Sequence, residues 1–549
     1  MFKVNLNLNT NHVKDMTFEK PITVEDIIKN DGVSLKDIMA YKINTEYVRS
    51  DKLVESDCIL DCISFDSTEG HLIYQDTMIF ILMKAFYGIY PEKRLVLEHS
   101  IGDGVFCEIF EDEILTADDV ELLQTEITKI IAAKMPITKM EVSIIEAHAI
   151  FTSLKRDDVV KNLKLDNLEI YKCGKYYDYY LRQLAENTAM VSSFELIYHS
   201  PGLILRFPRR GNRKIKDKFK LPRKIFETHQ EHDKWLNILN VHHVSALNRA
   251  IRNYNIVNLI QIEEALHEKK IVDIAARISW NKDVKIVLIA GPTASGKTSF
   301  AKRLSIQLIV NGINPRIVNM DDYFLPRKFT PRKEDGEYDF ENIRAINLDI
   351  LNDHLTRLLI GEEVEIPKYN FRKGITIESH SKMKLEENDI LIMEGIHGLN
   401  DVLTSAVPFN HKIKIYVSAL NNLNIDSHNR IRTSDSRKIR RIVRDHYFRG
   451  NSAEQTLFMW DDVRAGENMN IFPFQENADF MFNSILTYEL GVLKKYIEPL
   501  IKKISRFSPV YTEAKMLMRL FDNIENIEDH FVPSNSILRE FIGGSVFKY

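Results

Sequence analysis

KIVLIAGPTASGKTSF, residues 285–300, contains the signals that decide the fold. The apolar run 286–290 predicts a buried strand, and this strand ends at Gly291. GPTASGKT then fits the pattern G-x-x-x-x-G-K-[ST] of a phosphate-binding loop. Helical spacing over residues 299–308 predicts a helix whose N-terminus adds a favourable dipole. Strand, loop and helix therefore follow one another in the order that a nucleotide-binding parallel sheet requires.

Each residue type in this loop has a chemical reason. Glycine at both ends lets backbone N–H groups turn toward phosphate oxygens without a Cβ in the way. Lys297 supplies a mobile positive charge for the β- and γ-phosphates, and the Thr298 hydroxyl can ligate Mg²⁺. We therefore expect ATP and Mg²⁺ to be used, with ATP bound by Gly291, Pro292, Thr293, Ala294, Ser295, Gly296, Lys297, Thr298 and Ser299.

Length and composition limit the possible classes of protein. A chain of 549 residues is too long for one core and predicts about three or four domains. Hydrophobic residues make up 44% of the chain, enough for packed interiors, and a net charge of −4 argues against a nucleic-acid binder over the whole surface. The cysteines form no CxxC pair and no metal-binding spacing, which favours reduced thiols in a cytoplasmic protein: Cys58, Cys62, Cys107 and Cys173.

The sequence gives no membrane signal. Residues 1–15 lack the apolar core of a signal peptide. The longest apolar stretch, residues 78–90, has 13 residues and contains Lys84, which is too short to span a bilayer. We expect no membrane partner.

Acidic residues follow two further predicted strands. The strand over residues 315–320 ends at Asp321 and Asp322, and the strand over residues 390–393 ends at Glu394. Open α/β sheets bind ligands at the carboxyl ends of their strands, so these carboxylates should lie near the phosphates. Glu394 is predicted to hold Mg²⁺ with Thr298, partly through water; the alternative is an ordinary acid at a helix N-terminus. His397 is either a pocket wall or an ordinary loop histidine.

The arginine-rich run RKIRRIVRDHYFRG, residues 437–450, predicts a basic helix. At helical spacing Arg437, Arg441 and Arg444 share one face. Guanidinium groups suit phosphate oxygens, so the helix is predicted to close as a lid over the triphosphate. The alternative is a solvated helix paired to Asp435 and Asp445.

Residues 285–495 resemble the uridine kinase/phosphoribulokinase group of P-loop kinases. MDDYF resembles the family motif whose first Asp takes the acceptor proton, which implies that role for Asp321 with Tyr323 beside it. An aspartate with an ordinary pKa near 4 is a weak base, so orienting the hydroxyl would be its main work. RRIVRDHYFRG resembles the family lid and implies catalytic roles for Arg441, Arg444 and Arg449.

The same resemblance implies an acceptor site. IPKYNF resembles the segment whose tyrosine lies at the nucleoside, which implies Tyr369 and Phe371, although Tyr369 could also be a core aromatic. DFEN, which contributes Asp339, has Asn342 where the family has the Asp that holds ribose hydroxyls. This departure leaves the identity of the acceptor open. Tyr323, Asp321 and Arg441 complete the expected acceptor site, and Lys297 is expected to act in catalysis beside it.

The amino-terminal half resembles a different family. Residues 102–110 and 115–151 are similar to the second additional domain of threonyl-tRNA synthetases, and the preceding segment is similar to their TGS domain. In the synthetases this domain carries an editing site that is built from two His on one helix and from a later Cys and His. None of the corresponding residues is the expected ligand, so editing chemistry is expected to be absent: Asp76, Phe80, Tyr180 and Leu184.

These resemblances predict an α/β fold class, with a P-loop parallel-sheet kinase domain preceded by two smaller α+β domains, one β-grasp and TGS-like and one like the synthetase editing domain. The closing SNSILREFIGGS is similar to the tail of a subgroup of uridine kinase-related proteins. The predicted divisions are 1–65 (TGS-like), 66–210 (synthetase-like), 211–280 (basic linker and helical connector), 281–505 (kinase) and 506–549 (helical extension).

A basic segment separates the two halves. Ten of the nineteen residues 206–224 are Lys or Arg, opposed by Asp217 alone. The density could hold RNA phosphates, and the alternative is a solvated linker, since no aromatic platform is interleaved.

The function predicted from the sequence is ATP-dependent phosphorylation of a nucleoside hydroxyl, as in uridine or cytidine kinases. Members of the family that the chain resembles often self-associate, so we also expect a homo-oligomer. The alternatives are a kinase of another sugar-like alcohol, such as a pentose phosphate, and an RNA-binding regulator switched by ATP.

Overall fold

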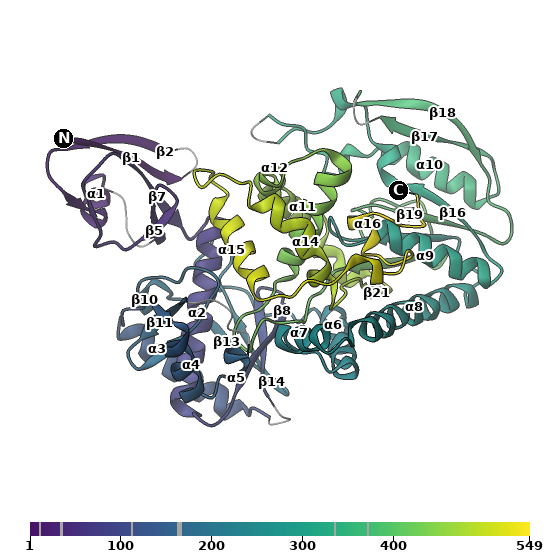
Figure 1. The fold of residues 1–549 in the computed structure, drawn as a ribbon. Coiled ribbons are helices and arrows are strands. Elements are labelled where there is room, and N and C mark those ends of the chain that lie inside the picture. Colours follow the sequence, from purple (N-terminus) through teal and green to yellow (C-terminus); the bar gives the residue numbers. More distant parts are fainter. Residues whose placement is uncertain are drawn as a thin grey trace.

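The computed structural model describes residues 1–549 except 10–11, 33–36, 111–113, 162–166, 334–335, 371–372 and 549 (Figure 1). It contains two smaller mixed units in the amino-terminal half and an α/β unit in the carboxyl-terminal half. The fold class predicted from the sequence is confirmed, whereas the residue boundaries of the domains remain predictions.

The first unit is a mixed five-stranded sheet with one helix against it. Strand β1 runs parallel to β7, and the other pairings are antiparallel. Helix α1 (Val24–Asn30) is capped by the Thr23 side chain and buries one apolar face in the core of this unit. The strand order is β2 (His12–Phe18), β1 (Phe2–Asn9), β7 (Cys58–Ser64), β4 (Ile38–Ile43) and β5 (Glu46–Val48).

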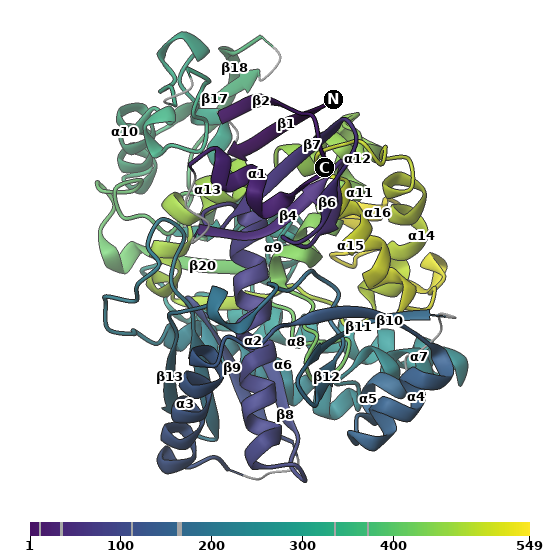
Figure 2. The ribbon, with the colours of Figure 1, turned by 90° about the vertical axis from the view of Figure 1, so that its left-hand side faces the viewer.

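The second unit is built around the long helix α2 (Thr68–Ile89), which runs from the amino-terminal sheet through this unit (Figure 2). Its apolar residues pack between a four-stranded sheet and α3 (Ala117–Ala132). Thr116 and Asp119 form the capping box that opens α3. The sheet order is β13 (Glu195–His199), β14 (Gly202–Arg206), β9 (Gly104–Ile109) and β8 (Leu95–Ile101).

Helix α2 also bears on the membrane question. Among the described residues it is the one helix that is long and apolar enough to cross a membrane by length and composition. In the protein, 61% of its most apolar window is buried. Such burial is typical of a core helix.

Smaller elements complete the amino-terminal half and lead into the carboxyl-terminal unit. A three-stranded sheet carries α4 (Ile144–Ser153) and α5 (Asp157–Val160) beside it. Three helices then form the connector predicted from helical spacing. The strands are β10 (Thr138–Ser143), β11 (Asn167–Cys173) and β12 (Tyr176–Asp178), and the connector helices are α6 (Arg223–Leu239), α7 (Val244–Arg252) and α8 (Ile256–Trp280).

The carboxyl-terminal unit, predicted from the sequence to be a kinase domain and called the kinase unit below, is built on a parallel five-stranded sheet. Its central strand β15 (Ile286–Ala290) is completely buried because both faces of the sheet are covered. Alternate residues of β15 point into two cores, one shared with α8, α9 (Lys297–Val310) and α11 (Thr433–Arg449), the other with α10 (Leu348–Leu359). The strand order is β16 (Asn314–Asn319), β19 (Asp389–Glu394), β15, β20 (Lys412–Ser418) and β21 (Phe480–Asn483).

Additional elements surround this sheet. The hairpin of β17 (Val364–Asn370) and β18 (Ile375–Met383) lies over the α10 side. The last helices pack beside α11, and the short α16 (Arg539–Ile542) returns to the start of α9 (Figure 1). The remaining helices are α12 (Ala453–Phe458), α13 (Trp460–Asn470), α14 (Glu489–Ile501) and α15 (Tyr511–Asp522).

Candidate functional site

The phosphate loop lies between β15 and α9, at the carboxyl edge of the sheet. Two of its residues have left-handed backbones, Ala294 at φ 57° and Gly296 at φ 82°. Gly291 has no room for a side chain, because a Cβ there would lie 1.9 Å from the Val417 carbonyl oxygen. The loop therefore bends back under the helix N-terminus, which points N–H groups toward a bound anion.

Lys297 lies inside this bend. Its Nζ donates to the carbonyl oxygens of Gly291 at 2.9 Å and Pro292 at 3.1 Å. Burial lowers the pKa of the ammonium, and the nearby carboxylates of Glu394, Glu540 and Asp321 act in the opposite direction. The lysine is thus surrounded by the acidic groups of the site.

Thr298 and Glu394 lie directly opposite each other. The Thr298 hydroxyl lies 3.0 Å from each carboxylate oxygen of Glu394 at the end of β19. Burial raises the pKa of Glu394 to about 7, opposed by the charge of Lys297. A hydroxyl and a carboxylate are oxygen ligands of the kind that Mg²⁺ prefers, so the pair fits the predicted metal site.

Asp321 lies in a short 3-10 turn, Met320–Tyr323, at the end of β16. Its backbone N–H donates to the Asn319 side chain at 2.9 Å, which fixes the turn. The carboxylate is half-buried and interacts with the charge of Lys297. Burial raises the pKa of Asp321 to about 6, with the Lys297 charge lowering it. The ordinary pKa near 4 expected from the sequence is therefore wrong, and the group is a better proton acceptor near neutral pH than we expected.

Three arginines of α11 converge on one buried carboxylate. Asp445 pairs with Arg444 at 2.8 Å and with Arg441 at 3.2 Å, while Arg449 lies at 3.7 Å. Arg441 also donates to the Thr293 hydroxyl at 3.4 Å. Three guanidinium groups share one aspartate, so positive charge remains beside the loop, and burial lowers the pKa of both Arg441 and Arg449.

Arg437 has a different position from the one expected from helical spacing. It is 1% exposed, forms an ion pair with Glu467 of α13, and donates from Nε to the Thr293 carbonyl oxygen at 3.0 Å. Glu467 in turn accepts from the Thr293 N–H at 3.1 Å. Arg437 and Glu467 therefore brace the phosphate loop, and no pattern in the sequence around Glu467 indicates this.

The residues predicted at the acceptor site are only partly brought together. Tyr369 is 5% exposed and packs edge-on against Phe324, as expected for the core aromatic that was its alternative. Tyr323 is buried, and its hydroxyl lies 3.2 Å from His354 Nδ1 on α10. Both rings belong to the core shared with α10, Tyr369 from within β17 and Tyr323 from the turn after β16. Phe371 lies outside the described residues.

The remaining predicted acceptor residues lie on one loop. The Asn342 amide donates to Asp339 at 3.3 Å, and its oxygen accepts from the Arg344 N–H at 3.0 Å. The charge of Asp339 acts on His397, whose ring is buried and whose two nitrogens have no partner among the described residues. Burial lowers the pKa of His397 to about 4 and keeps the imidazole neutral.

The sequence did not reveal two further carboxylates. Glu341 packs against Gly466, and burial raises its pKa to about 7 within reach of the charges of Arg441 and Asp321. Glu540, from the tail, binds Ser299. Glu341 is not marked by a motif because it lies beside Asn342, where the sequence departs from the family pattern. Glu540 is not marked because it lies 241 positions from Ser299 in the chain.

Part of the basic segment forms ion pairs within the protein. Arg206 is 1% exposed and pairs with Asp103, Glu195 and Asp217, so it is not available to RNA. Beyond it, side chains alternate: inner positions are half-buried or paired, and outer positions are exposed lysines. The outer positions are Lys214, Lys216, Lys218 and Lys220.

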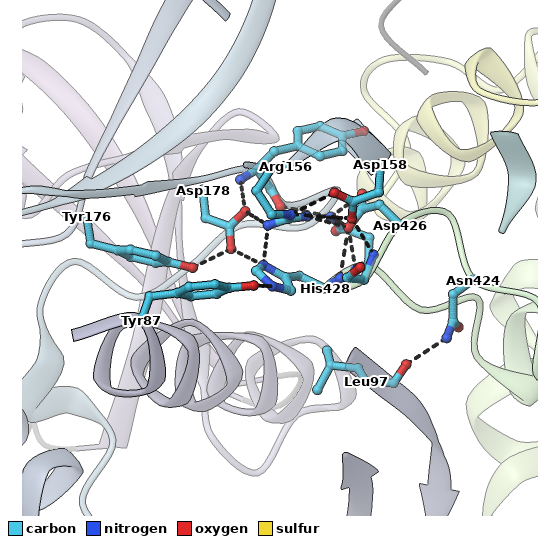
Figure 3. Close-up of polar contacts among 12 residues, drawn as sticks. Tyr87, Leu97, Arg156, Asp158, Tyr176, Asp178, Asn424, Asp426 and His428 are labelled. Carbon is cyan, nitrogen blue, oxygen red and sulfur yellow. Dashed lines mark hydrogen bonds and ion pairs between the residues drawn. The ribbon is translucent and has the colours of Figure 1, made fainter. Parts of the chain in front are cut away.

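A buried polar network joins the kinase unit to the synthetase-like unit (Figure 3). Arg156 binds Asp178 at 2.9 Å and Asp426 at 3.0 Å, and His428 lies 2.6 Å from Asp178. Asp426 and His428 belong to residues 419–432, which lead from β20 into α11. The arginine-rich helix α11 is therefore anchored at its start in the amino-terminal half of the chain.

The same segment of the kinase unit lies against the positions that correspond to the synthetase editing residues. Arg432 forms an ion pair with Asp76, while Phe80 packs against Tyr180 in the core of the second unit. Leu184 is 1% exposed in that core. The helix of the expected editing histidines thus serves here as a packing surface for the kinase unit.

Comparison with known proteins agrees with this arrangement. Residues 286–490 match the phosphoribulokinase/uridine kinase family. This part of the chain is a phosphoribulokinase/uridine kinase family domain. Proteins of this kind use ATP and Mg²⁺ in general. The phosphate loop, Asp321, Glu394 and the three lid arginines all lie within the matched residues.

Individual relatives match the two halves separately. Uridine kinase of Halobacterium salinarum is 25% identical over 194 residues, which cover 35% of this chain and 77% of that protein. Threonine–tRNA ligase of Clostridioides difficile is 28% identical over 166 residues, 29% of this chain and 26% of the ligase, and such ligases match the amino-terminal region. A solved structure, a possible uridine kinase from Bacillus stearothermophilus, has a TM-score of 0.25 and 16% identity over 36% of this chain and 89% of that one.

Proposed function

We propose that the kinase unit transfers the γ-phosphate of ATP to a hydroxyl of a nucleoside, with uridine and cytidine the best candidates. The observation that carries this proposal is the convergence of Lys297, the Thr298–Glu394 pair and Asp321 at one edge of the sheet. These groups are a phosphate-binding cation, a metal-binding pair and a proton acceptor, which are the parts that phosphoryl transfer needs.

The chain's residues divide the work. Lys297 and the loop N–H groups bind and orient the phosphates, while Arg441 and Arg444 add positive charge where negative charge builds up. Asp321 orients the acceptor hydroxyl and takes its proton at the carboxylate. Mg²⁺ bound at Thr298 and Glu394 would neutralise charge on the phosphate oxygens.

The choice of a nucleoside rests on the named relatives and on the acceptor loop. Matching proteins include uridine kinases and a uridine-cytidine kinase. Asp339 and Asn342 both carry side chains that can bind sugar hydroxyls. Because Asn342 replaces the expected aspartate, another sugar-like alcohol remains the alternative acceptor.

A substrate panel tests the proposal. Purified protein with Mg-ATP is given uridine, cytidine, other nucleosides and pentose phosphates, and ADP formation is measured with and without each acceptor. We expect acceptor-dependent ADP formation that is lost in Lys297→Ala and in Asp321→Asn, with unchanged circular dichroism. ADP release that no acceptor increases contradicts a kinase of this kind.

A second candidate function is RNA binding through the basic segment. The exposed positions 214, 216, 218 and 220 alternate along the chain with half-buried or paired residues. This comb of lysines could follow a phosphate backbone, and the matches to threonine–tRNA ligases favour RNA as the partner.

Replacement of the four lysines by Gln tests this second candidate. Titration with a tRNA at several salt concentrations should give a slope of log K against log [salt] that falls by about three to four in the variant. Lys502→Gln, an exposed lysine outside the segment, is the control. An unchanged slope in the fourfold variant contradicts RNA binding by this comb.

A further inference from the structure

The tail of the chain returns to the phosphate loop. Ile537 lies so close to Gly296 that a Cβ on the glycine would be 2.5 Å from its Cγ2 atom. Further along, Phe541 is buried beneath the guanidinium of Arg440, whose Nη1 lies 3.4 Å from the Ala294 carbonyl oxygen. The tail is therefore packed against both the loop and the lid helix α11.

Glu540 projects from this packed tail onto the start of α9. Its carboxylate accepts from the Ser299 N–H at 3.2 Å and from the Ser299 hydroxyl at 2.6 Å. Its charge also acts on Lys297 and on Arg449. A single anionic side chain thus contacts the helix N-terminus and faces the lysine and one lid arginine.

Ser299 is the third residue of α9, and its N–H belongs to the set left without a partner inside the helix. In a phosphate loop these N–H groups, with those of the loop itself, hold the phosphates of the nucleotide. A carboxylate bound there satisfies the same donor with the same sign of charge. A nucleotide phosphate and the Glu540 carboxylate therefore require one position.

We propose that Glu540 is a built-in competitor for the nucleotide phosphates, so that the tail holds the loop in a state of reduced nucleotide affinity. This inference rests on the proposed use of ATP by the loop. Because Ile537, Leu538 and Phe541 are buried, the tail backbone stays in place and the Glu540 side chain rotates away. Only the Glu540 side chain therefore moves, while the tail that carries it stays packed against the loop.

Removal of the charge at position 540 should strengthen nucleotide binding. If the carboxylate occupies the site about nine-tenths of the time, the apparent Kd for nucleotide is raised about ten-fold. We therefore expect Glu540→Gln to bind ADP and ATP about ten-fold more tightly than the wild type by isothermal titration calorimetry. Glu528→Gln, on the same tail with a side chain 63% exposed, is the matched control and should leave both Kd values unchanged.

A second measurement uses the unaltered protein. Because the tail backbone stays in place, hydrogen exchange of residues 537–543 in the wild type should be unchanged on saturation with ADP, while exchange of the phosphate loop and of the start of α9 should slow. Faster exchange of residues 537–543 would show that the tail itself leaves the loop and contradicts the proposal that one side chain moves, even if the variant fails to fold.

The outcomes separate this inference from the proposed function. Nucleotide binding that is equal or weaker in Glu540→Gln overturns the competitor and leaves the kinase intact. Failure of ADP and ATP to bind in the wild type and in both variants overturns the competitor together with the kinase.

Discussion

The Thr298 hydroxyl lies 3.0 Å from each of the two carboxylate oxygens of Glu394, although ninety-six positions separate the two residues in the chain. The parallel pairing of β15 with β19 brings them together, because it aligns Ile289 with Glu394 at the edge where the loop begins. This contact joins the motif that decides the fold to an acidic residue that only the sheet can place.

The first prediction concerns the metal requirement. Glu394→Gln removes the charge but keeps the shape, so the Mg²⁺ concentration that gives half-maximal ADP formation should rise at least about ten-fold. Glu394 has a pKa of about 7, so in the wild type this concentration should also increase as pH falls from 8 to 6, since the protonated acid attracts Mg²⁺ less. The variant should lose that pH dependence; a retained dependence would assign it to another group.

The second prediction concerns the proton acceptor. The pKa of Asp321 is raised to about 6, and its charged form accepts the proton, so kcat/KM should rise with pH up to about 6 and then level off. Asp321→Asn should lower kcat about 10²–10⁴-fold and abolish that limb. The measurement is the pH profile of acceptor-dependent ADP formation, and a limb that persists in the Asp321→Asn variant contradicts the assignment.

The ionised carboxylate of Asp321 should also lower the stability of the folded protein. Its folded pKa lies above the unfolded value of 3.8, so the ionised form is disfavoured by folding; the penalty is absent below the unfolded pKa and is fully developed above about pH 6. Asp321→Asn should therefore raise Tm at pH 8, and the gain should shrink as pH falls toward 4. A Tm that falls at pH 8 would show that the carboxylate stabilises the fold.

The third prediction distinguishes a structural role of Arg437 on α11 from a catalytic role of Arg449. Arg437→Ala leaves the buried Glu467 with Arg464 as its remaining cationic partner and should lower the free energy of unfolding by about 1.5–3 kcal/mol. Arg449→Ala, whose side chain is 58% exposed, should leave stability within about 0.5 kcal/mol but lower kcat. Urea denaturation and initial rates of both variants provide the comparison, and equal loss of stability in the two would remove the distinction.

The fourth prediction concerns the junction of the two halves. Arg156→Met leaves Asp158, Asp178 and Asp426 buried with less positive charge, which should destabilise the protein by about 3–5 kcal/mol. Lys155→Met removes an exposed pair with Glu92 and should change stability by less than about 0.5 kcal/mol. If both variants unfold at the same urea concentration, the network does not hold the halves together.

Much of the kinase unit could be predicted from sequence because its signals are local. The strand at 286–290, the loop and the helix after it follow from apolar runs and glycine spacing. The carboxyl-edge rule also placed Asp321 and Glu394 near the loop without any knowledge of contacts.

Other features depended on contacts that no local pattern encodes. The burial of Tyr369 depends on how the β17–β18 hairpin folds over α10, and the role of Arg437 depends on Glu467, thirty positions away. The pKa of Asp321 follows from burial, which residue spacing does not report. Glu540 lies 241 positions from its partner Ser299, so it could only be found in three dimensions.

The most direct test follows the phosphoryl group itself. Protein incubated with ATP labelled in the γ-phosphate, Mg²⁺ and uridine or cytidine is analysed for labelled nucleoside monophosphate by chromatography. The account predicts label in the monophosphate with the wild type and none with Lys297→Ala. Label that appears only as inorganic phosphate, at the same rate with or without any alcohol acceptor, would contradict the central claim that Asp321 directs an acceptor hydroxyl at the bound nucleotide.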